Sequence, residues 1–397
     1  MALFKSKLEL NLQIAIKNKH YKNYRVLIYY KALKDNIEKK IKSYKGNLFR
    51  SISSANCICA SLSSTSIERL TEYPEISYIT FDNYAILSGS STLAANGISF
   101  RSTNKYTGKG IGIGIVDSGT YPHSDLISQN NKIYGFLDLI NNYKYPYDDN
   151  GHGTFISGII CGSGALSKGM YKGVAENSHI YSIKTFNSIG RAYISDILYA
   201  IEILIDKSEE FNIKIICLPF ELIDIDYFIL SLFSKLFNLA VEKGITIVVP
   251  SGNCGNAEGS LRGIAALENC ITVSGLDTTN TSKPYEYSSG GIFNKLEKPN
   301  LSAACVDICS LNSNIKFISE RNGCKIYPPA LDKPYTYYSG TSCAAAFIAG
   351  VCALLYEKNH ELDFKNTLSL LKASCRSLDL NKTLQGSGVI DISKLII

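Results

Sequence analysis

The sequence lacks the features that would mark a repeat, fibrous or membrane-spanning protein. Its 397 residues contain no internal repeat, no long low-complexity tract and no apolar stretch near the ~20 residues that a membrane-spanning helix needs. We therefore expect no membrane partner. With 45% apolar and 19% charged side chains, the chain is long enough to bury one large core or two ordinary ones.

No export signal is visible either. The first twenty residues hold no apolar run long enough for the h-region of a signal peptide, which predicts a cytoplasmic protein. The most apolar long segment, 227–241, is interrupted by polar residues and is predicted to be a buried helix.

Cysteine is abundant, with twelve residues, but its spacing does not suggest disulfides or zinc. The two close pairs, Cys57 with Cys59 and Cys305 with Cys309, have no histidine near them and no second pair at zinc-finger spacing. We expect free thiols in a reducing compartment, and neither a metal nor another cofactor.

Charge is unevenly distributed along the chain. Residues 1–85 carry 14 Lys+Arg against 7 Asp+Glu, whereas the remainder carries 27 against 28. A basic segment can bind nucleic acid. Here the basic residues alternate with acidic and apolar ones, which is typical of the solvated face of a folded domain, so no nucleic-acid partner is expected.

The N-terminal part reads as a small α+β domain. The expected elements are strands at 25–30, 48–62 (two strands of a hairpin) and 76–81, and helices at 33–44 and 64–73. Thr65 is the predicted cap of the second helix, with Glu68 three residues on. The order β-α-β-β-α-β is the ferredoxin-like pattern. The domain would span 1–87, with no role assigned to 1–24, and the Ser- and Gly-rich segment 88–105 would be a linker.

From Gly110 onward, the pattern changes to alternating strands and helices. Strands are expected at 111–116, 180–184, 213–218, 245–249 and 271–273, and helices at 155–162, 195–207 and 227–243. This alternation predicts an α/β fold over 106–397, with a parallel sheet covered by helices on both faces. Functional sites in such folds lie at the carboxyl ends of the strands.

Three residues with reactive side chains follow strand ends or open helices. Asp117 lies in VDSG, His152 in NGHGT and Ser342 in SGTSCAAA. Each alone has an ordinary interpretation as a turn residue, a helix cap or a helix start. Together they supply a nucleophile, a base that removes its proton and a carboxylate that orients the base.

At this point the chain resembles the subtilisin-like serine peptidases, or subtilases. The resemblance runs from about Tyr106 to Ile396 and rests on five ordered motifs: YTGKGIGIGIVDSG, NGHGTFISGII, YKGVAEN, VVPSGNCG and YSGTSCAAAFIAG. It implies peptide hydrolysis through an acyl-enzyme on Ser342, with His152 as general base and acid and Asp117 orienting it. Asn253 would bind the oxyanion together with the backbone N–H of Ser342.

The resemblance also implies that a substrate peptide binds as an added β-strand. One edge would be Gly190, Arg191 and Ala192, and the other Leu218, Pro219, Phe220 and Glu221. The second edge departs from the family pattern, because Pro219 removes a backbone donor and Glu221 stands where the family usually has glycine. Two interpretations stay open: narrow specificity, with a basic substrate side chain facing Glu221, or a partly blocked cleft. The latter corresponds to a catalytically silent scaffold that binds a partner peptide.

Two further features follow from the resemblance. The family often binds calcium, and Asp125 matches one of its ligands, but the ligand loop looks replaced by GSGALSKGMYKG, so no calcium site is predicted. Cys254 and Cys343 flank the expected oxyanion site, which predicts sensitivity to thiol reagents.

The N-terminal domain resembles, in pattern, the inhibitory propeptide of the family. Its last strand would enter the cleft as an intramolecular inhibitor, and self-cleavage is expected near 85–90. A permanently attached regulatory module is the alternative. The sequence as a whole predicts a cytoplasmic serine endopeptidase of narrow specificity. A dedicated processing role, as in germination proteases or leader peptidases, fits this pattern, and the residues do not choose between the two.

Overall fold

The computed structural model describes residues 6–87, 96, 105–222, 226–292 and 297–395. The chain forms two compact units. The first contains Met1–Tyr84 and Tyr193–Glu202, and the second contains Ala85–Ala192 and Ile203–Ile397. Each has a hydrophobic core of its own.

The first unit is a four-stranded antiparallel sheet in the order β2-β3-β1-β4. Its elements are α1 (Leu10–Lys17), β1 (Tyr24–Tyr30), α2 (Lys34–Ser43), β2 (Asn47–Ile52), β3 (Cys57–Leu62), α3 (Ser64–Thr71) and β4 (Ile76–Phe81). The β-α-β-β-α-β order expected of residues 25–87 is present. Helix α1, for which the sequence suggested no role, buries Leu12, Ala15 and Ile16 in the core of this unit.

The predicted cap of α3 was wrong. Ser63, not Thr65, is the capping residue, and its hydroxyl accepts the N–H of Ser66 at 3.3 Å. The physical reason is the backbone: Ser63 is extended, as a capping residue must be, whereas Thr65 already lies within the helix.

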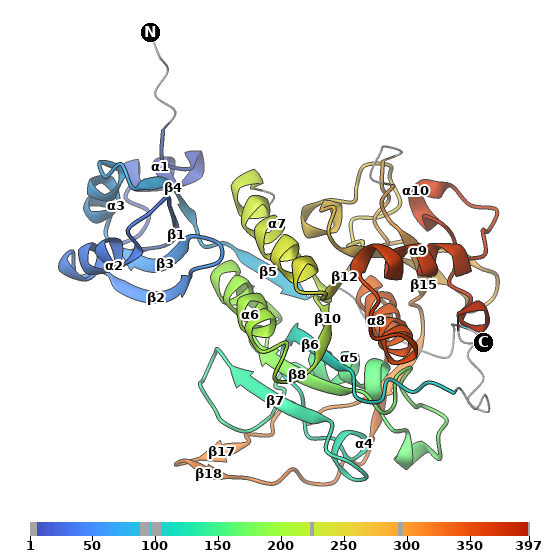
Figure 1. Ribbon diagram of the computed structural model, residues 1–397. Helices are drawn as coiled ribbons and strands as arrows, with labels where there is room; N and C mark the ends of the chain where they lie inside the picture. Colours follow the sequence, from blue (N-terminus) through green and yellow to red (C-terminus); the bar gives the residue numbers. More distant parts are fainter. Residues whose placement is uncertain (1–5, 88–95, 97–104, 223–225, 293–296, 396–397) are drawn as a thin grey trace. The chain divides into compact units, whose positions relative to one another are not determined.

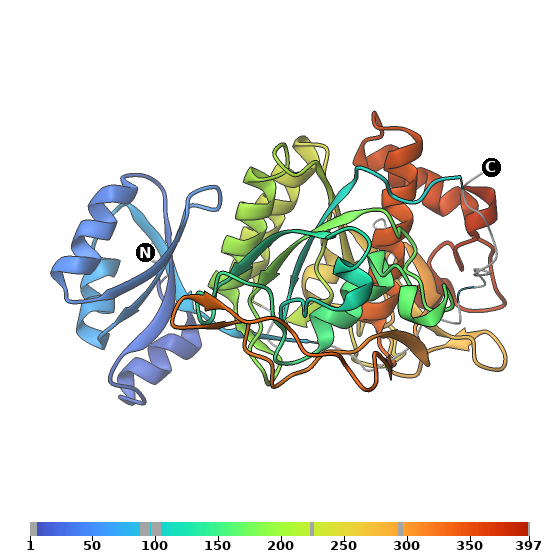
Figure 2. The ribbon, with the colours of Figure 1, turned by 90° about the horizontal axis from the view of Figure 1, so that it is seen from below.

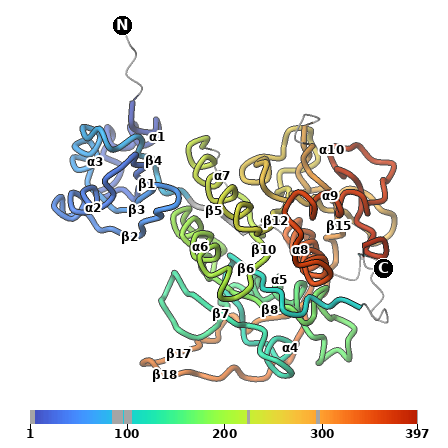
Figure 3. Tube along the Cα trace, viewed as in Figure 1, coloured from blue at the N-terminus to red at the C-terminus, as the bar shows by residue number. Residues whose placement is uncertain are grey.

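The second unit is built on an eight-stranded sheet in the order β14-β13-β12-β10-β6-β8-β7, with β15 pairing with β13 (Figures 1 and 3). The strands are β6 (Gly112–Asp117), β7 (Ile133–Asp138), β8 (His179–Lys184), β10 (Ile213–Cys217), β12 (Thr246–Pro250), β13 (Ile271–Asp277), β14 (Lys283–Pro284) and β15 (Leu301–Ala304). All neighbours pair in parallel except β14. The predicted parallel sheet is confirmed, and β7 and β15 are two strands that the sequence analysis missed.

Helices cover both faces of this sheet. Helices α6 (Ile194–Asp206) and α7 (Tyr227–Glu242) lie on one face, and α5 (His152–Cys161) and α8 (Thr341–Lys358) on the other (Figure 1). The alternation within β6 shows the two sides. Ile113 and Ile115 enter the core with α5 and α8, whereas a side chain at Gly114 would collide with Leu204 of α6.

Helix α8 is the central helix of the unit. Every residue from Thr341 to Tyr356 is buried. In the part of the chain that the structure describes, this helix alone is long and apolar enough to cross a membrane, and 89% of its apolar window is buried within the fold. Its apolar character is therefore explained by the core. A helix forms over the predicted segment 227–241, but α7 buries only one face: Tyr227 is 88% exposed, and the buried residues are Ile229, Leu232, Phe233, Leu236, Phe237 and Ala240.

Smaller elements complete the second unit. They are α4 (Ser124–Ile127), α9 (Phe364–Ser374), α10 (Lys382–Gln385), β5 (Tyr84–Leu87), β9 (Arg191–Tyr193), β11 (Phe220–Leu222), β16 (Ile308–Leu311), β17 (Glu320–Arg321), β18 (Cys324–Lys325) and β19 (Tyr335–Tyr338). The hairpin β17-β18 extends away from the main sheet (Figures 1 and 2). Strands β11, β5 and β9 form a separate three-stranded sheet in that order.

Candidate active site

The structure brings the three reactive residues into hydrogen-bonding contact. His152 Nδ1 lies 2.8 Å and 3.0 Å from the two carboxylate oxygens of Asp117, and His152 Nε2 lies 3.1 Å from Ser342 Oγ. All three side chains are at least 90% buried. The arrangement places an imidazole between a carboxylate and a hydroxyl, as general-base activation of a serine requires.

Asp117 is held at the end of β6 by its own turn. Its Oδ1 accepts the N–H of Ser118 at 2.6 Å. The Ser118 hydroxyl in turn accepts the N–H of Gly153, in the first turn of α5, at 2.9 Å. Gly153 permits this approach, because a side chain there would lie 2.0 Å from the carbonyl oxygen of Gly119. The HGT sequence therefore lets α5 bring His152 against the aspartate.

Asp148 organises the loop before His152, and the sequence analysis missed it. Its Oδ1 accepts the Ser118 hydroxyl and the N–H groups of Asn150 and Gly151, at 2.8–3.1 Å. Its Oδ2 accepts the N–H and the hydroxyl of Thr154, at 2.8 and 2.6 Å. Asp148 therefore links the start of α5 to the Asp117 turn. The only signal in the sequence is its position four residues before His152.

Lys184 is a second buried polar residue that the sequence analysis did not single out. It ends β8 opposite Asp117 in the sheet register and is fully buried. Its ammonium donates to the Ser118 carbonyl at 2.7 Å, to the Phe186 carbonyl at 3.0 Å and to Asp149 at 2.5 Å. These bonds tie the Asp117 turn to the loop that carries His152.

Helix α8 places Ser342, the predicted nucleophile, next to the loop that carries the predicted oxyanion residue. Ser342 lies in the first turn of this helix, whose N-terminus favours developing negative charge. The neighbouring Thr341 hydroxyl donates to the carbonyl of Gly252, immediately before Asn253, at 3.3 Å. Within the described residues, Asn253 Oδ1 is buried and has no hydrogen-bond partner. The loop after β12 thus lies against the start of the nucleophile helix.

The two predicted substrate-binding edges lie on either side of a strand from the chain itself. Arg191 and Ala192 belong to β9, which follows Gly190, and Phe220 and Glu221 belong to β11. Strand β5 lies between them and pairs antiparallel with β11, with Leu87 opposite Phe220 and Ala85 opposite Leu222. The sheet thus has room for one extended segment between these edges, and β5 fills it.

The departures from the family pattern have structural consequences. Leu218 N–H donates to the Val248 carbonyl, and Phe220 N–H turns back to the Leu218 carbonyl at 2.9 Å, so Pro219 separates β10 from β11. Glu221 Oε2 accepts the backbone N–H of Asn253 at 2.8 Å. Burial raises the pKa of Glu221, and the Asn253 N–H and the nearby Arg262 oppose that rise.

The residues around Asp125, the position that the resemblance links to calcium, do not fit a calcium site. Both carboxylate oxygens of Asp125 accept hydrogen bonds from the protein: Oδ1 from Leu166 N–H at 3.1 Å and Oδ2 from the Tyr335 hydroxyl at 2.6 Å. Among the described residues, no three His, Cys, Asp or Glu side chains gather as a metal site would require.

All twelve cysteines are free thiols in the structure. The two beside the site differ sharply in environment. Cys343 is buried, and burial raises the pKa of its thiol to about 12. Cys254 is exposed. The expected thiol sensitivity therefore falls on Cys254, because a protonated, buried thiol reacts slowly.

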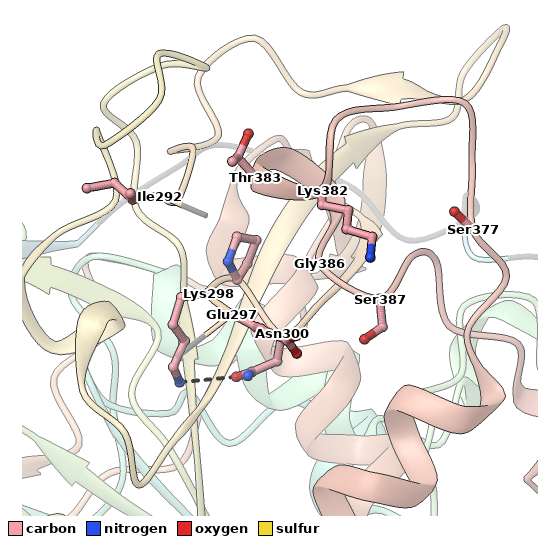
Figure 4. Close-up of a pocket in the computed structure, with 10 residues that line it drawn as sticks. Ile292, Glu297, Lys298, Asn300, Ser377, Lys382, Thr383, Gly386 and Ser387 are labelled. Carbon is pink, nitrogen blue, oxygen red and sulfur yellow. Dashed lines mark hydrogen bonds between the residues drawn. The ribbon is translucent and has the colours of Figure 1, made fainter. Parts of the chain in front are cut away.

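A cavity of about 280 Å³ lies elsewhere in the second unit and contains none of these residues (Figure 4). Lys298 lines it, but its ammonium is satisfied by the Cys270 carbonyl at 2.7 Å, Thr272 Oγ1 at 3.0 Å and Asn300 Oδ1 at 3.1 Å. Burial lowers the pKa of this lysine. Its contacts bind neighbouring strands together, so this cavity is separate from the catalytic geometry.

Comparison with known proteins agrees with this geometry. The chain matches the subtilase family, Peptidase S8, over residues 108–388. It is 31% identical over 304 residues to serine protease AprX of Bacillus subtilis, covering 73% of this chain and 67% of AprX. It is 28% identical over 269 residues to subtilisin-like protease 1 of Plasmodium falciparum, covering 66% of this chain but 37% of that protein.

Two solved structures share the fold. Fervidolysin from Fervidobacterium pennivorans, a keratinolytic enzyme, has a TM-score of 0.73 at 19% identity, covering 95% of this chain and 61% of that one. The epidermin leader peptide processing serine protease of Staphylococcus aureus has a TM-score of 0.72 at 18% identity, covering 95% and 98%. The ordered motifs, the fold and these relatives lead to one conclusion: the chain belongs to the subtilase family of serine peptidases.

Proposed function

We propose that this subtilase is an endopeptidase of narrow specificity that cleaves its own chain near residues 85–90. The observation that carries the proposal is the pairing of Ala85–Leu87 with Phe220–Leu222, which places β5 between β11 and β9. An extended peptide added to an edge strand is the binding mode expected for a substrate. The end of the N-terminal segment therefore serves as the intramolecular ligand of the cleft.

In the proposed mechanism, His152 Nε2 takes the proton of Ser342 as Oγ attacks the peptide carbonyl. Asp117 holds the other ring nitrogen and stabilises the imidazolium that forms. The Asn253 amide and the Ser342 N–H receive the oxyanion. His152 then protonates the leaving amine, which frees the new N-terminus, and a water molecule activated by the same imidazole hydrolyses the acyl-enzyme.

The strand register supports cleavage just beyond β5. In the antiparallel pairing, residue numbers rise along β5 as they fall along β11, so the chain after Leu87 heads toward Leu218 and the end of β10. Residues 88–90, the second half of the expected cleavage interval, lie outside the described residues. Asp117 ends β6, the neighbour of β10 in the sheet.

Two observations support a dedicated processing role. Pro219 and Glu221 replace the small, open segment usual in the family. One structural neighbour is named for leader peptide processing. The free thiols favour a reducing compartment, in agreement with the proposed cytoplasmic location.

The test compares wild-type protein with Ser342→Ala by intact mass and gel after expression of the full chain. Loss of the nucleophile lowers turnover by on the order of a millionfold. We expect the wild-type chain to be cleaved near residues 85–90 and the Ser342→Ala chain to remain uncleaved. If both stay whole, a fluorophosphonate probe decides: labelling of Ser342 indicates an active enzyme with a retained regulatory domain, and no labelling indicates a silent peptide-binding scaffold.

A further inference from the structure

We propose that Glu221 is a positioning residue that holds the oxyanion loop in place from within the peptide-binding strand. Its role is to fix the backbone of Gly252 and Asn253, so that the Asn253 amide is directed at the position where the oxyanion forms, together with the Ser342 N–H. The inference deepens the proposed peptidase function and rests on it. It assigns a further role to a residue that was predicted to line the substrate cleft.

The contact that carries the proposal is short and half-buried. Glu221 Oε2 accepts the N–H of Asn253 at 2.8 Å. The neighbouring Gly252 has φ +100°, a conformation that favours glycine, and a side chain there would lie 2.8 Å from the same oxygen and 3.1 Å from Ser289 Oγ. The carboxylate therefore packs directly against the loop backbone.

Other bonds continue from this loop to the nucleophile. The Gly252 carbonyl accepts the Ser289 N–H at 3.1 Å and the Thr341 hydroxyl at 3.3 Å. Ser289 Oγ accepts the N–H of Cys254 at 2.9 Å. Residues 252–254 are thus held on one side by Glu221 and on the other by Ser289 and Thr341. Removing Glu221 leaves the Asn253 N–H without its acceptor.

The backbone of Glu221 simultaneously pairs with the segment that occupies the cleft. It lies opposite Ile86 in the register of β11 with β5, while its side chain contacts the oxyanion loop. One residue thus connects the strand that binds peptide with the loop that stabilises the transition state. The Glu221 contact would stabilise the transition state by holding the Asn253 amide in position. Because the oxyanion develops only in the transition state, a misplaced amide lowers kcat rather than substrate affinity.

This role differs from that of a charged specificity pocket. A carboxylate that paired with a basic substrate side chain would matter only for Lys or Arg substrates, and its charge would be essential. A positioning acceptor matters for every substrate, and glutamine can replace it because the amide oxygen still accepts a hydrogen bond.

The test measures kcat and KM for Glu221→Ala and Glu221→Gln on two peptide series, with Lys or Ala before the cleaved bond. Glu258→Ala, at an exposed acid in the same loop, is the matched control. We expect Glu221→Ala to lower kcat about tenfold on both series with KM nearly unchanged. Glu221→Gln and the control should stay within about twofold of wild type.

A double-mutant cycle shows whether Glu221 acts through Asn253. Asn253→Ala should lower kcat by on the order of 100-fold or more, and adding Glu221→Ala to it should then cost less than about twofold. An independent tenfold loss in that background would overturn the proposal. So would a loss confined to Lys substrates that Glu221→Gln shares, because that pattern belongs to a specificity pocket.

Hydrogen exchange separates this inference from the function itself. In the Ser342→Ala protein, which has no turnover to lose, Glu221→Ala should speed exchange of the Asn253 N–H at least about tenfold, and Glu221→Gln should not. If Glu221→Ala leaves exchange of the Asn253 N–H unchanged, the positioning role is refuted, even if the protein is an active peptidase. The opposite result is also informative. If Glu221→Ala speeds exchange of the Asn253 N–H but the wild-type protein hydrolyses no peptide, the loop contact is supported and the peptidase function is refuted.

Discussion

Two buried aspartates, one in each unit, cap the start of a helix by different means. In the first unit, Asp82 accepts the N–H and hydroxyl of Ser195 at 2.8 and 2.5 Å and pairs with Arg25 at 2.6 Å. In the second unit, Asp148 serves α5 with five hydrogen bonds from neutral donors. Among the described residues, Asp148 forms no ion pair with a lysine or arginine.

The difference shows what each carboxylate is built to do. Asp82 belongs to a charged cluster with Arg25, Asp196 and Arg50, in which the Arg25 guanidinium also stacks on Tyr193 at 3.5 Å. Such a cluster stabilises the packing of the segments that carry its charges. Removing one charge is costly, because its partner then stays buried with fewer opposite charges. Asp148 organises the turn that precedes His152. The Lys184 ammonium in this region binds Asp149 and the Ser118 carbonyl, whereas neutral donors alone hold Asp148 among the described residues.

The largest effect should come from Asp148→Ala. We expect kcat/KM to fall about 100-fold, because the loop before His152 loses its five bonds and the imidazole shifts from Asp117. Peptide hydrolysis and the pH profile of the purified enzyme measure it. Asp148→Asn keeps an acceptor oxygen and should recover part of the loss. Equal losses in both variants would mean that the negative charge, not the geometry, matters.

The second effect concerns stability rather than rate. Asp82→Ala removes the closer carboxylate partner of Arg25 and the acceptor of the buried Ser195, and removing one partner of such a pair typically costs about 3 kcal/mol or more. Protection from hydrogen exchange in residues 6–84 should fall, measured in the Ser342→Ala background to prevent cleavage. Exposed Glu68→Ala is the control. Unchanged protection would show that the cluster does not stabilise this unit.

A smaller effect is expected for Arg25→Lys. The ammonium retains the charge, but it cannot bridge Asp82 and Asp196 as the guanidinium does, nor stack as well on Tyr193. We expect a loss of about 1 kcal/mol in the same exchange experiment. A loss as large as that of Asp82→Ala would show that bidentate geometry, rather than charge, dominates the cluster.

The smallest expected effect concerns the reactivity of the two thiols beside the site, Cys254 and Cys343. A maleimide at pH 8 should label Cys254 and leave Cys343 unmodified in the folded protein, because burial raises the Cys343 pKa to about 12, far above that pH. Peptide mapping identifies the labelled residue. Cys254→Ser should keep activity and resist the reagent, whereas inhibition that persists in Cys254→Ser would point to Cys343.

The sheet and the reactive residues were predictable for different reasons. Apolar runs such as 111–116 and 245–249 mark buried parallel strands, because both of their faces are covered. Asp117, His152 and Ser342 stand in local motifs that shape their own turns. Strand β7 was not predicted, because the residues on its solvent-facing side interrupt the apolar pattern: Tyr134 is 59% exposed.

The supporting polar residues were not predictable, because tertiary contacts alone define them. Nothing near Lys184 in the sequence shows that its ammonium will meet the Ser118 carbonyl, 66 residues away. Glu221 was predicted to line the substrate cleft and, in one of two interpretations, to face a basic substrate side chain. Its bond to Asn253 was not foreseen, because that bond depends on the approach of a separate loop. The expected linker at 88–105 lies outside the described residues except for Asn96 and Lys105.

Strand β5 has one more consequence, which concerns concentration. A ligand that belongs to the same chain meets its cleft at an effective concentration that short tethers set in the millimolar range, whatever the amount of protein in solution. Dilution therefore cannot release β5, and an outside peptide must compete against that fixed value. Once the chain is cut, the same strand competes only at its own bulk concentration. Hydrolysis of a single bond would thus turn β5 from a tethered occupant of the cleft into a ligand that dilution can remove.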